Sequence, residues 1–198
     1  MNTTHSTRRR AAIALVAAAA LTLTGCSPGP AENAVPNWPP ASLEHYDLAG
    51  LDAPQIINTL DTMPVADRPN DLIASVQPTE LVLTSGDESL ETIPIPEDQF
   101  YLSVAPYYTS THPCRFHSLT TCLGEIANEQ VHVTVTDNAS GDTLIDEPLT
   151  TYDNGFLGLW LPRGITATLT IDHDGRTATA PISTGDDDLT CLTTMQLA

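Results

Sequence analysis

The chain has 198 residues and is strongly acidic, with seven basic residues against 25 acidic ones and a net charge of −18. Such a field repels phosphate backbones and anionic lipid headgroups, so the composition argues against nucleic-acid binding. The carboxylates are scattered and form no recognisable oxygen cage for calcium or magnesium, which indicates a solvated acidic surface.

The N-terminal segment has the pattern of an export signal. Three arginines at positions 8–10 precede an apolar run over 11–23, which at about 13 residues is too short to span a bilayer as a helix. The run ends in Leu23-Thr24-Gly25-Cys26, which resembles the lipobox of bacterial lipoproteins. We predict a signal peptide over residues 1–25 and a lipidated Cys26 that anchors the protein to the extracytoplasmic face of the cell membrane. The alternative is an ordinary secreted protein with a chance cysteine at this place.

The segment after Cys26 differs in composition from the rest of the chain. Residues 26–41 are rich in proline and small side chains, which predicts an extended tether. A helix is then expected from about Ala53 to Met63, because Asp52 can cap it and Gln55 completes a capping box. Residues 72–84 and 90–95 are rich in aliphatic and β-branched side chains and flank a Ser-Gly-Asp turn at 85–87, which predicts a strand pair. Together these elements predict a small α+β subdomain over residues 42–98.

Strands dominate the prediction for residues 99–198. The alternation of Val131, Val133 and Val135 with polar residues is typical of a half-buried strand. Turn sequences at 138–141, 153–155 and 173–175 separate further strands. The strands expected here are 100–107, 131–136, 143–149, 156–161, 165–171, 176–182 and 191–197. The fold class is therefore α+β and mainly β, with an antiparallel sandwich-like C-terminal domain.

Three cysteines remain once Cys26 carries lipid: Cys114, Cys122 and Cys191. In an oxidising compartment at most one disulfide can form among them, so one thiol needs another purpose. His112 and His117 flank Cys114 in sequence, which places two imidazoles and two thiols close together along the chain. This grouping indicates thiol or metal chemistry.

Thiolate and imidazole ligands point to copper or zinc. Seven residues separate Cys114 from Cys122 and Cys191 is distant, a spacing that disfavours a zinc finger. Three thiols brought together by folding would suit Cu(I). We expect His132 and His173, on a polar strand face and in a turn, to be bystanders, and Met63 and Met195 to be core residues.

The chain also resembles the CueP family of extracytoplasmic copper-binding proteins. The resemblance lies in Val104-Ala105-Pro106-Tyr107, the segment 114–125, Tyr152-Asp153-Asn154-Gly155-Phe156 with Trp160-Leu161-Pro162-Arg163, and Thr190-Cys191-Leu192-Thr193-Thr194. It implies that Cys114, Cys122 and Cys191 are the copper-linked residues, and that the protein holds periplasmic copper and possesses a copper-recipient partner such as an extracytoplasmic superoxide dismutase. This chain departs from the soluble members of the family by carrying a lipobox.

Three functional hypotheses follow. The first is a copper-binding lipoprotein that sequesters or delivers Cu(I) through the three cysteines, with His112 and His117 as additional ligands, and contributes to copper homeostasis and resistance. The second uses the same thiols as a Cu(II) reductase or oxidoreductase, although the Cys-x-x-Cys pattern of thioredoxin-like proteins is absent from the sequence. The third is a structural lipoprotein stapled by one disulfide. The first, a metal-binding protein rather than an enzyme, is favoured.

Overall fold

The computed structural model describes residues 42–198, so the predicted signal peptide, tether and lipidated Cys26 lie outside the described residues. The elements follow in the order η1 Leu43–Tyr46, α1 Ala53–Asp61, η2 Val65–Asp67, β1 Leu72–Val76, β2 Glu80–Ser85, β3 Glu88–Pro94, β4 Gln99–Tyr107, β5 His117–Ser118, β6 Gln130–Asp137, β7 Thr143–Thr150, β8 Leu157–Pro162, β9 Thr166–His173, β10 Arg176–Ser183 and β11 Cys191–Gln196. One α-helix among many strands confirms the α+β, mainly β class.

Helix α1 begins where its capping residues predict. The Asp52 side chain accepts a hydrogen bond from the Gln55 backbone N–H, and the Gln55 side chain accepts one from the Asp52 N–H. Ile56, Ile57 and Leu60 form its buried face. The helix ends at Asp61, two residues before the predicted end at Met63.

The first sheet has the order β3-β2-β1-β5. The single strand predicted over residues 72–84 is two strands, because the chain turns at 77–79 and Val76 pairs with Leu81 across an antiparallel hairpin. The turn contains Pro78, which has no N–H to donate to a sheet. Strand β1 also pairs with the short β5, which brings the cysteine-rich segment to this sheet.

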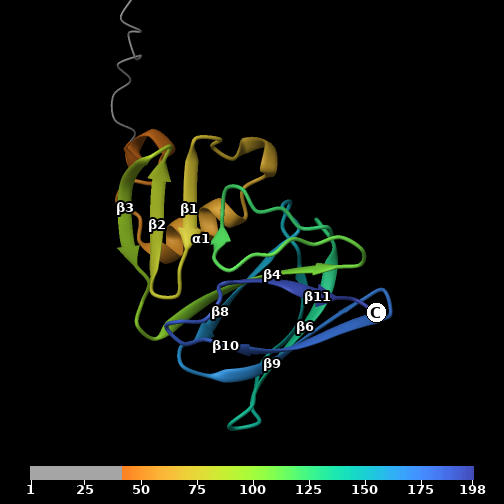
Figure 1. The fold of residues 1–198 in the computed structure, drawn as a ribbon. Coiled ribbons are helices and arrows are strands. Elements are labelled where there is room, and N and C mark those ends of the chain that lie inside the picture. The colour runs from red at the N-terminus through yellow and green to blue at the C-terminus, as the bar shows by residue number, and fades with distance from the viewer. Residues whose placement is uncertain (1–41) are drawn as a thin grey trace, which may run out of the picture. The chain divides into compact units, whose positions relative to one another are not determined.

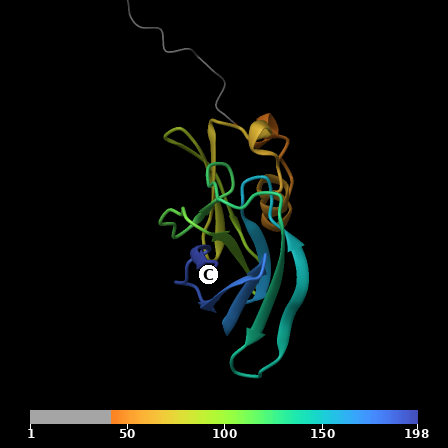
Figure 2. The same ribbon diagram turned by 90° about the vertical axis from the view of Figure 1, so that its right-hand side faces the viewer.

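The other two sheets have the orders β10-β9-β6-β7 and β11-β4-β8. The β6 side chains alternate between buried and more exposed, as their sequence predicts. Strand β11 runs parallel to β4, whereas a purely antiparallel arrangement was predicted for this part of the chain. Figure 2 shows the long β6–β7 hairpin extending away from the end of the fold that carries α1.

The buried side chains form three clusters. The largest fills the space between the sheets containing β4 and β6, and the second joins α1 to β1 and β2 (Figure 1). Tyr101 and Leu119 belong to this second cluster, so residues from beyond position 98 complete it. The third cluster is small and contains Ala105, Phe156 and Cys191, with Cys114 and Cys122 packed against it. Cys191 therefore lies in a packed interior, whereas Cys114 and Cys122 are part-exposed at its edge.

Candidate metal centre

The three cysteines predicted to act together come together in the fold. Cys114 lies in the loop between β4 and β5, Cys122 follows β5, and Cys191 is the first residue of β11. Cys114 and Cys191 are joined by a disulfide that spans 77 residues of sequence, and Cys122 is a free thiol. The Cys122 Sγ lies 3.8 Å from the Cys114 Sγ. All three sulfurs thus meet at one place.

Backbone hydrogen bonds bring Cys191 to the cysteine-rich segment. The Arg115 carbonyl accepts from the N–H groups of Thr190 and Cys191, at 3.0 and 3.2 Å. The Thr190 carbonyl in turn accepts from the Ser103 N–H of β4, at 2.9 Å. Parallel pairing of β11 with β4 therefore places Cys191 beside a loop that lies far away in sequence.

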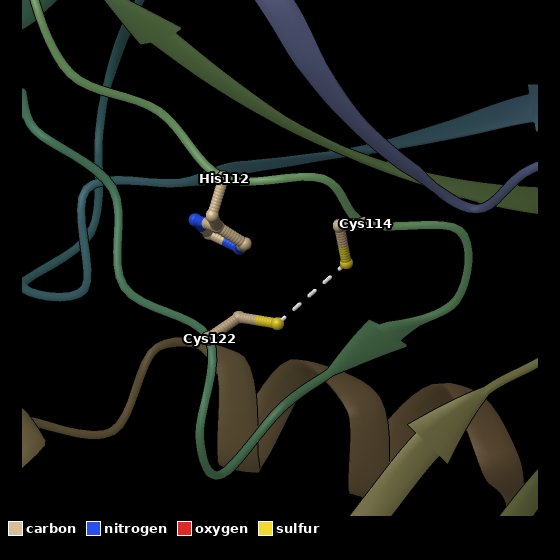
Figure 3. A group of neighbouring side chains, drawn as sticks. All are labelled: His112, Cys114 and Cys122. Carbon is tan, nitrogen blue, oxygen red and sulfur yellow. Dashed lines mark hydrogen bonds between the residues drawn. The ribbon is translucent and has the colours of Figure 1, made fainter.

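Two overlapping groups of side chains have the composition of a metal site. The outer set is His112, Cys114 and Cys122, all part-exposed, and Figure 3 shows their side chains directed toward one another. The inner set is His117, Cys122 and Cys191, of which His117 and Cys191 are buried. Within each set the donor atoms lie within 4.8 Å of one another. Two sulfurs that both bind one metal ion at about 2.3 Å lie at most about 4.6 Å apart. Small shifts of the donor atoms would therefore allow either set to bind an ion.

His117 is held in place by a buried carboxylate that the sequence analysis did not single out. Its Nε2 lies 2.9 Å from Oδ1 of Asp61, the last residue of α1, and both side chains are fully buried. Its Nδ1 lies 3.8 Å from the Cys191 Sγ. One ring nitrogen therefore contacts the carboxylate while the other faces the sulfurs, the arrangement in which a carboxylate orients a metal-binding histidine.

Asp61 is itself held by several donors. Tyr101 donates its hydroxyl to Oδ2 at 2.5 Å, and Asn154 donates its amide N–H to Oδ1 at 2.9 Å. The guanidinium of Arg68 donates to the main-chain carbonyls of Asp61 and Cys122, at 3.3 and 3.2 Å. The carboxylate itself is stable in this buried position because its oxygens are satisfied by Tyr101, Asn154 and His117.

The charges of this cluster shift the ionisation of its members. Burial opposes protonation of His117, but the Asp61 carboxylate outweighs burial and raises the pKa of His117 to about 9. Burial likewise disfavours the Cys122 thiolate, but hydrogen bonding to His117 and the charge of its ring lower the pKa of Cys122 below its ordinary value. Thiolate is the form that binds metals and attacks disulfides, so Cys122 is the activated sulfur of the site.

Comparison with known proteins identifies the family. The family model described as periplasmic copper-binding protein CueP matches residues 55–196. The chain belongs to the CueP family. A solved structure titled "Crystal Structure of S.CueP" is 42% identical, with a TM-score of 0.73, and the match covers 79% of this chain and 94% of that chain. A comparison with curated proteins found no match.

CueP is described as a periplasmic copper-binding family, which supports copper as the metal of this candidate site. The soft sulfur and imidazole donors of the site fit that metal. The family is also consistent with an extracytoplasmic location, and among residues 42–198 no helix is long and apolar enough to cross a membrane.

A surface carboxylate holds the loop that carries His112. Glu125 accepts hydrogen bonds from the N–H groups of Tyr108, Thr109 and Ser110, at 2.8 to 3.1 Å, and from the Thr109 hydroxyl at 2.6 Å. The Thr109 side chain is the largest of the influences that lower the pKa of Glu125 to about 2. His112 lies two residues after Ser110 on the same loop. Glu125 therefore constrains the position in which His112 can join the outer set.

Two glycines allow the segment just after Cys122 to contact the turn that carries Asn154. The Gly124 N–H donates to the Asn154 carbonyl at 2.6 Å, and a Cβ added at Gly124 would lie 2.5 Å from the Gly155 carbonyl oxygen. Gly155 also has a φ of +76°, which other residues rarely adopt. This backbone contact is the physical reason for glycine at both positions.

The remaining predicted residues lie elsewhere. His132 contacts Asp146 on the β6–β7 surface, and the Nδ1 of His173 lies 2.6 Å from the Tyr108 hydroxyl. Met195 is buried in the largest core cluster and Met63 packs against the second. Met63 and Met195 thus belong to the core, as predicted, and neither His132 nor His173 is a member of the two candidate sets of metal ligands.

No sequence motif pointed to Asp61, Arg68 or Tyr101 as residues of the site. Asn154 was expected only as a turn residue. Asp61 carries a readable signal, since it follows Ile56, Ile57 and Leu60 on the apolar face of α1. A carboxylate on such a face implies a buried partner. The identity of that partner, His117, depends on the pairing of β5 with β1.

Proposed function

We propose that this protein is an extracytoplasmic, lipid-anchored copper carrier that holds Cu(I) through the reduced thiols of Cys114, Cys122 and Cys191. The observation that carries the proposal is the convergence of these three sulfurs beside the two imidazoles of His112 and His117. Thiolates are soft ligands, which favours Cu(I) over Cu(II) as the bound oxidation state. The choice of copper over zinc is supported by the copper-binding family.

The Cys114–Cys191 disulfide makes copper binding dependent on redox state. A disulfide offers no thiolate. Among residues 42–198 of the oxidised protein, Cys122 is therefore the cysteine that can still bind a metal through a free thiol. Reduction of that bond by an external dithiol, which gives up two electrons and two protons and itself becomes a disulfide, restores the two missing ligands. The carrier therefore alternates between an oxidised form that holds Cu(I) weakly and a reduced form that holds it tightly.

The lipobox supports the anchoring part of the proposal. A protein held at the extracytoplasmic face by Cys26 would meet copper that has crossed the membrane, which fits a role in copper homeostasis and resistance. The recipient of the metal is a second extracytoplasmic protein, with a superoxide dismutase as the example that the family resemblance suggests. The acidic chain would favour a recipient with a basic docking surface.

The test is a competition titration of Cu(I) against a chromophoric chelator, under oxygen-free conditions. The reduced full chain carrying Cys26→Ser is compared with the same chain carrying Cys191→Ser in addition, and with the oxidised form. We expect one tight equivalent in the reduced protein and a sharp loss of affinity in the other two. If none of the three binds a tight equivalent, the chain is a disulfide-stapled lipoprotein and not a copper carrier.

A second candidate function, reduction of Cu(II), is favoured by the disulfide itself. Two Cu(II) ions accept one electron each from the thiols of Cys114 and Cys191, which form the S–S bond and release two protons. The test adds Cu(II) to the reduced Cys26→Ser chain and counts both Cu(I) and remaining thiols. A reductase yields two Cu(I) and loses two thiols per chain, whereas a carrier without this activity keeps all three thiols.

A further inference from the structure

The outer and inner sets share one ligand and differ in exposure. Cys122 belongs to both sets, while His112 and Cys114 complete the outer one and His117 and Cys191 the inner one. The relative exposure of His117 is 0% and that of Cys191 is 1%, whereas all three outer residues are part-exposed. An ion arriving from solvent therefore meets the outer set first.

The two sets also differ in how firmly they are held. In the inner set, the Asp61 carboxylate fixes the ring of His117, and Cys191 is pinned by backbone bonding to Arg115. In the outer set, His112 lies on a surface loop held by the exposed carboxylate of Glu125 and by one hydrogen bond from the Thr111 hydroxyl to the Thr193 carbonyl, and its own ring has no hydrogen-bonded partner among the described residues. A preorganised buried set retains a metal better than an exposed one, because its ligands lose less freedom on binding.

We propose that Cu(I) binds first to the outer set and then moves to the inner set by ligand exchange, with Cys122 bound throughout. The inference deepens the proposed function and rests on it: the three thiols of that proposal bind the ion in turn, Cys114 on entry and Cys191 in the buried state, with Cys122 common to both. His112 and Cys114 leave the ion as His117 and Cys191 bind it. The Cys191 thiol gives up its proton on binding and the departing Cys114 thiolate takes one up, so the oxidation state of the metal is unchanged.

The short distances make this transfer physically reasonable. The Cys114 and Cys122 sulfurs lie 3.8 Å apart, and Nδ1 of His117 is 3.8 Å from the Cys191 sulfur. The ion therefore moves only a few ångströms and keeps at least one thiolate ligand at every stage. His112 is then a gating ligand, which accelerates the passage of copper in both directions without contributing to its final binding.

The experiment measures equilibrium and rate separately in four reduced full-length chains, all carrying Cys26→Ser. They are the parent, His112→Ala, His117→Gln and a control, His132→Ala, which removes an exposed imidazole outside both sets. Cu(I) uptake from a chromophoric chelator, and release to a stronger one, are followed by stopped-flow absorbance. Circular dichroism verifies that each variant is folded, and copper X-ray absorption reports the nitrogen and sulfur ligands.

We expect His112→Ala to slow uptake and release by the same factor, on the order of ten, with affinity and metal coordination unchanged. His117→Gln should weaken affinity by about tenfold or more, chiefly through faster release, because it removes an inner ligand. The control should match the parent. The proposal is overturned if His112→Ala changes neither rate, or if it lowers affinity as much as His117→Gln does. A parent chain without a tight equivalent instead overturns the proposed function.

Discussion

The Nε2 atom of His117 lies 2.9 Å from Oδ1 of Asp61, and neither side chain is exposed to solvent. This contact joins the end of helix α1 to strand β5, which carries the cysteine-rich segment. The helix therefore supports the candidate metal centre although it contributes no sulfur. Four predictions follow from this arrangement and its surroundings.

Replacement of Asp61 should destabilise the fold strongly. Asp61→Ala leaves the buried His117 ring and the Tyr101 hydroxyl without their partner, which should lower the free energy of unfolding by about 3–5 kcal/mol. Denaturant unfolding of the metal-free protein measures this change. Asp146→Ala, which breaks an exposed contact with His132, is the control and should change stability by less than about 1 kcal/mol. Equal effects of the two substitutions would contradict a structural role for the buried pair.

Stability should fall on the alkaline side of neutrality. The folded pKa of His117, about 9, lies above its ordinary value of 6.5, so the protonated ring stabilises the fold fully below about pH 6.5. That contribution is lost as the pH rises to about 9. Unfolding is measured across this range in a Cys122→Ser background, because the lowered pKa of that thiol acts in the opposite direction. Adding His117→Gln should flatten the dependence of unfolding free energy on pH. If the slope between about pH 6.5 and 9 stays the same, His117 is not the group responsible for it.

Cys122 should be the reactive thiol of the oxidised protein. In the Cys26→Ser chain, one thiol should react with a maleimide before reduction and three after it, and peptide mapping should find Cys114 linked to Cys191. The reaction at neutral pH should slow in His117→Gln, since the imidazolium lowers the pKa of Cys122. His45→Gln, an exposed histidine, serves as the control. A bridge containing Cys122 would contradict the structure.

Loss of the Glu125 side chain should loosen the His112 loop without unfolding the protein. Glu125→Ala removes the acceptor of the Tyr108, Thr109 and Ser110 amides, so hydrogen exchange at these three positions should accelerate. Exchange in the core strand β6 should remain unchanged. Glu147→Ala, an exposed substitution on β7, provides the comparison. Unaltered exchange in the loop would mean that Glu125 does not hold it.

Much of the fold was predictable because its signals are local. The capping box at Asp52 and Gln55 marked the start of α1, and alternating valines marked β6. The hairpin at 173–175 was predicted from its turn residues, and Asp174 and Gly175 indeed have positive φ angles. The strand predicted over 72–84 was wrong in its continuity, because the polar residues 77–80 with Pro78 mark a turn that the aliphatic composition of the flanking residues outweighed.

The three cysteines and two nearby histidines that could bind copper were recognisable from residue types, spacing and family resemblance alone. Their arrangement around one point depends on the folded chain. The parallel pairing of β11 with β4 and the pairing of β5 with β1 bring Cys191 and His117 to Cys122. Asp61, which precedes His117 by 56 residues in the sequence, contacts its ring. Such long-range pairings depend on the packing of whole sheets, so no local pattern of residues encodes them.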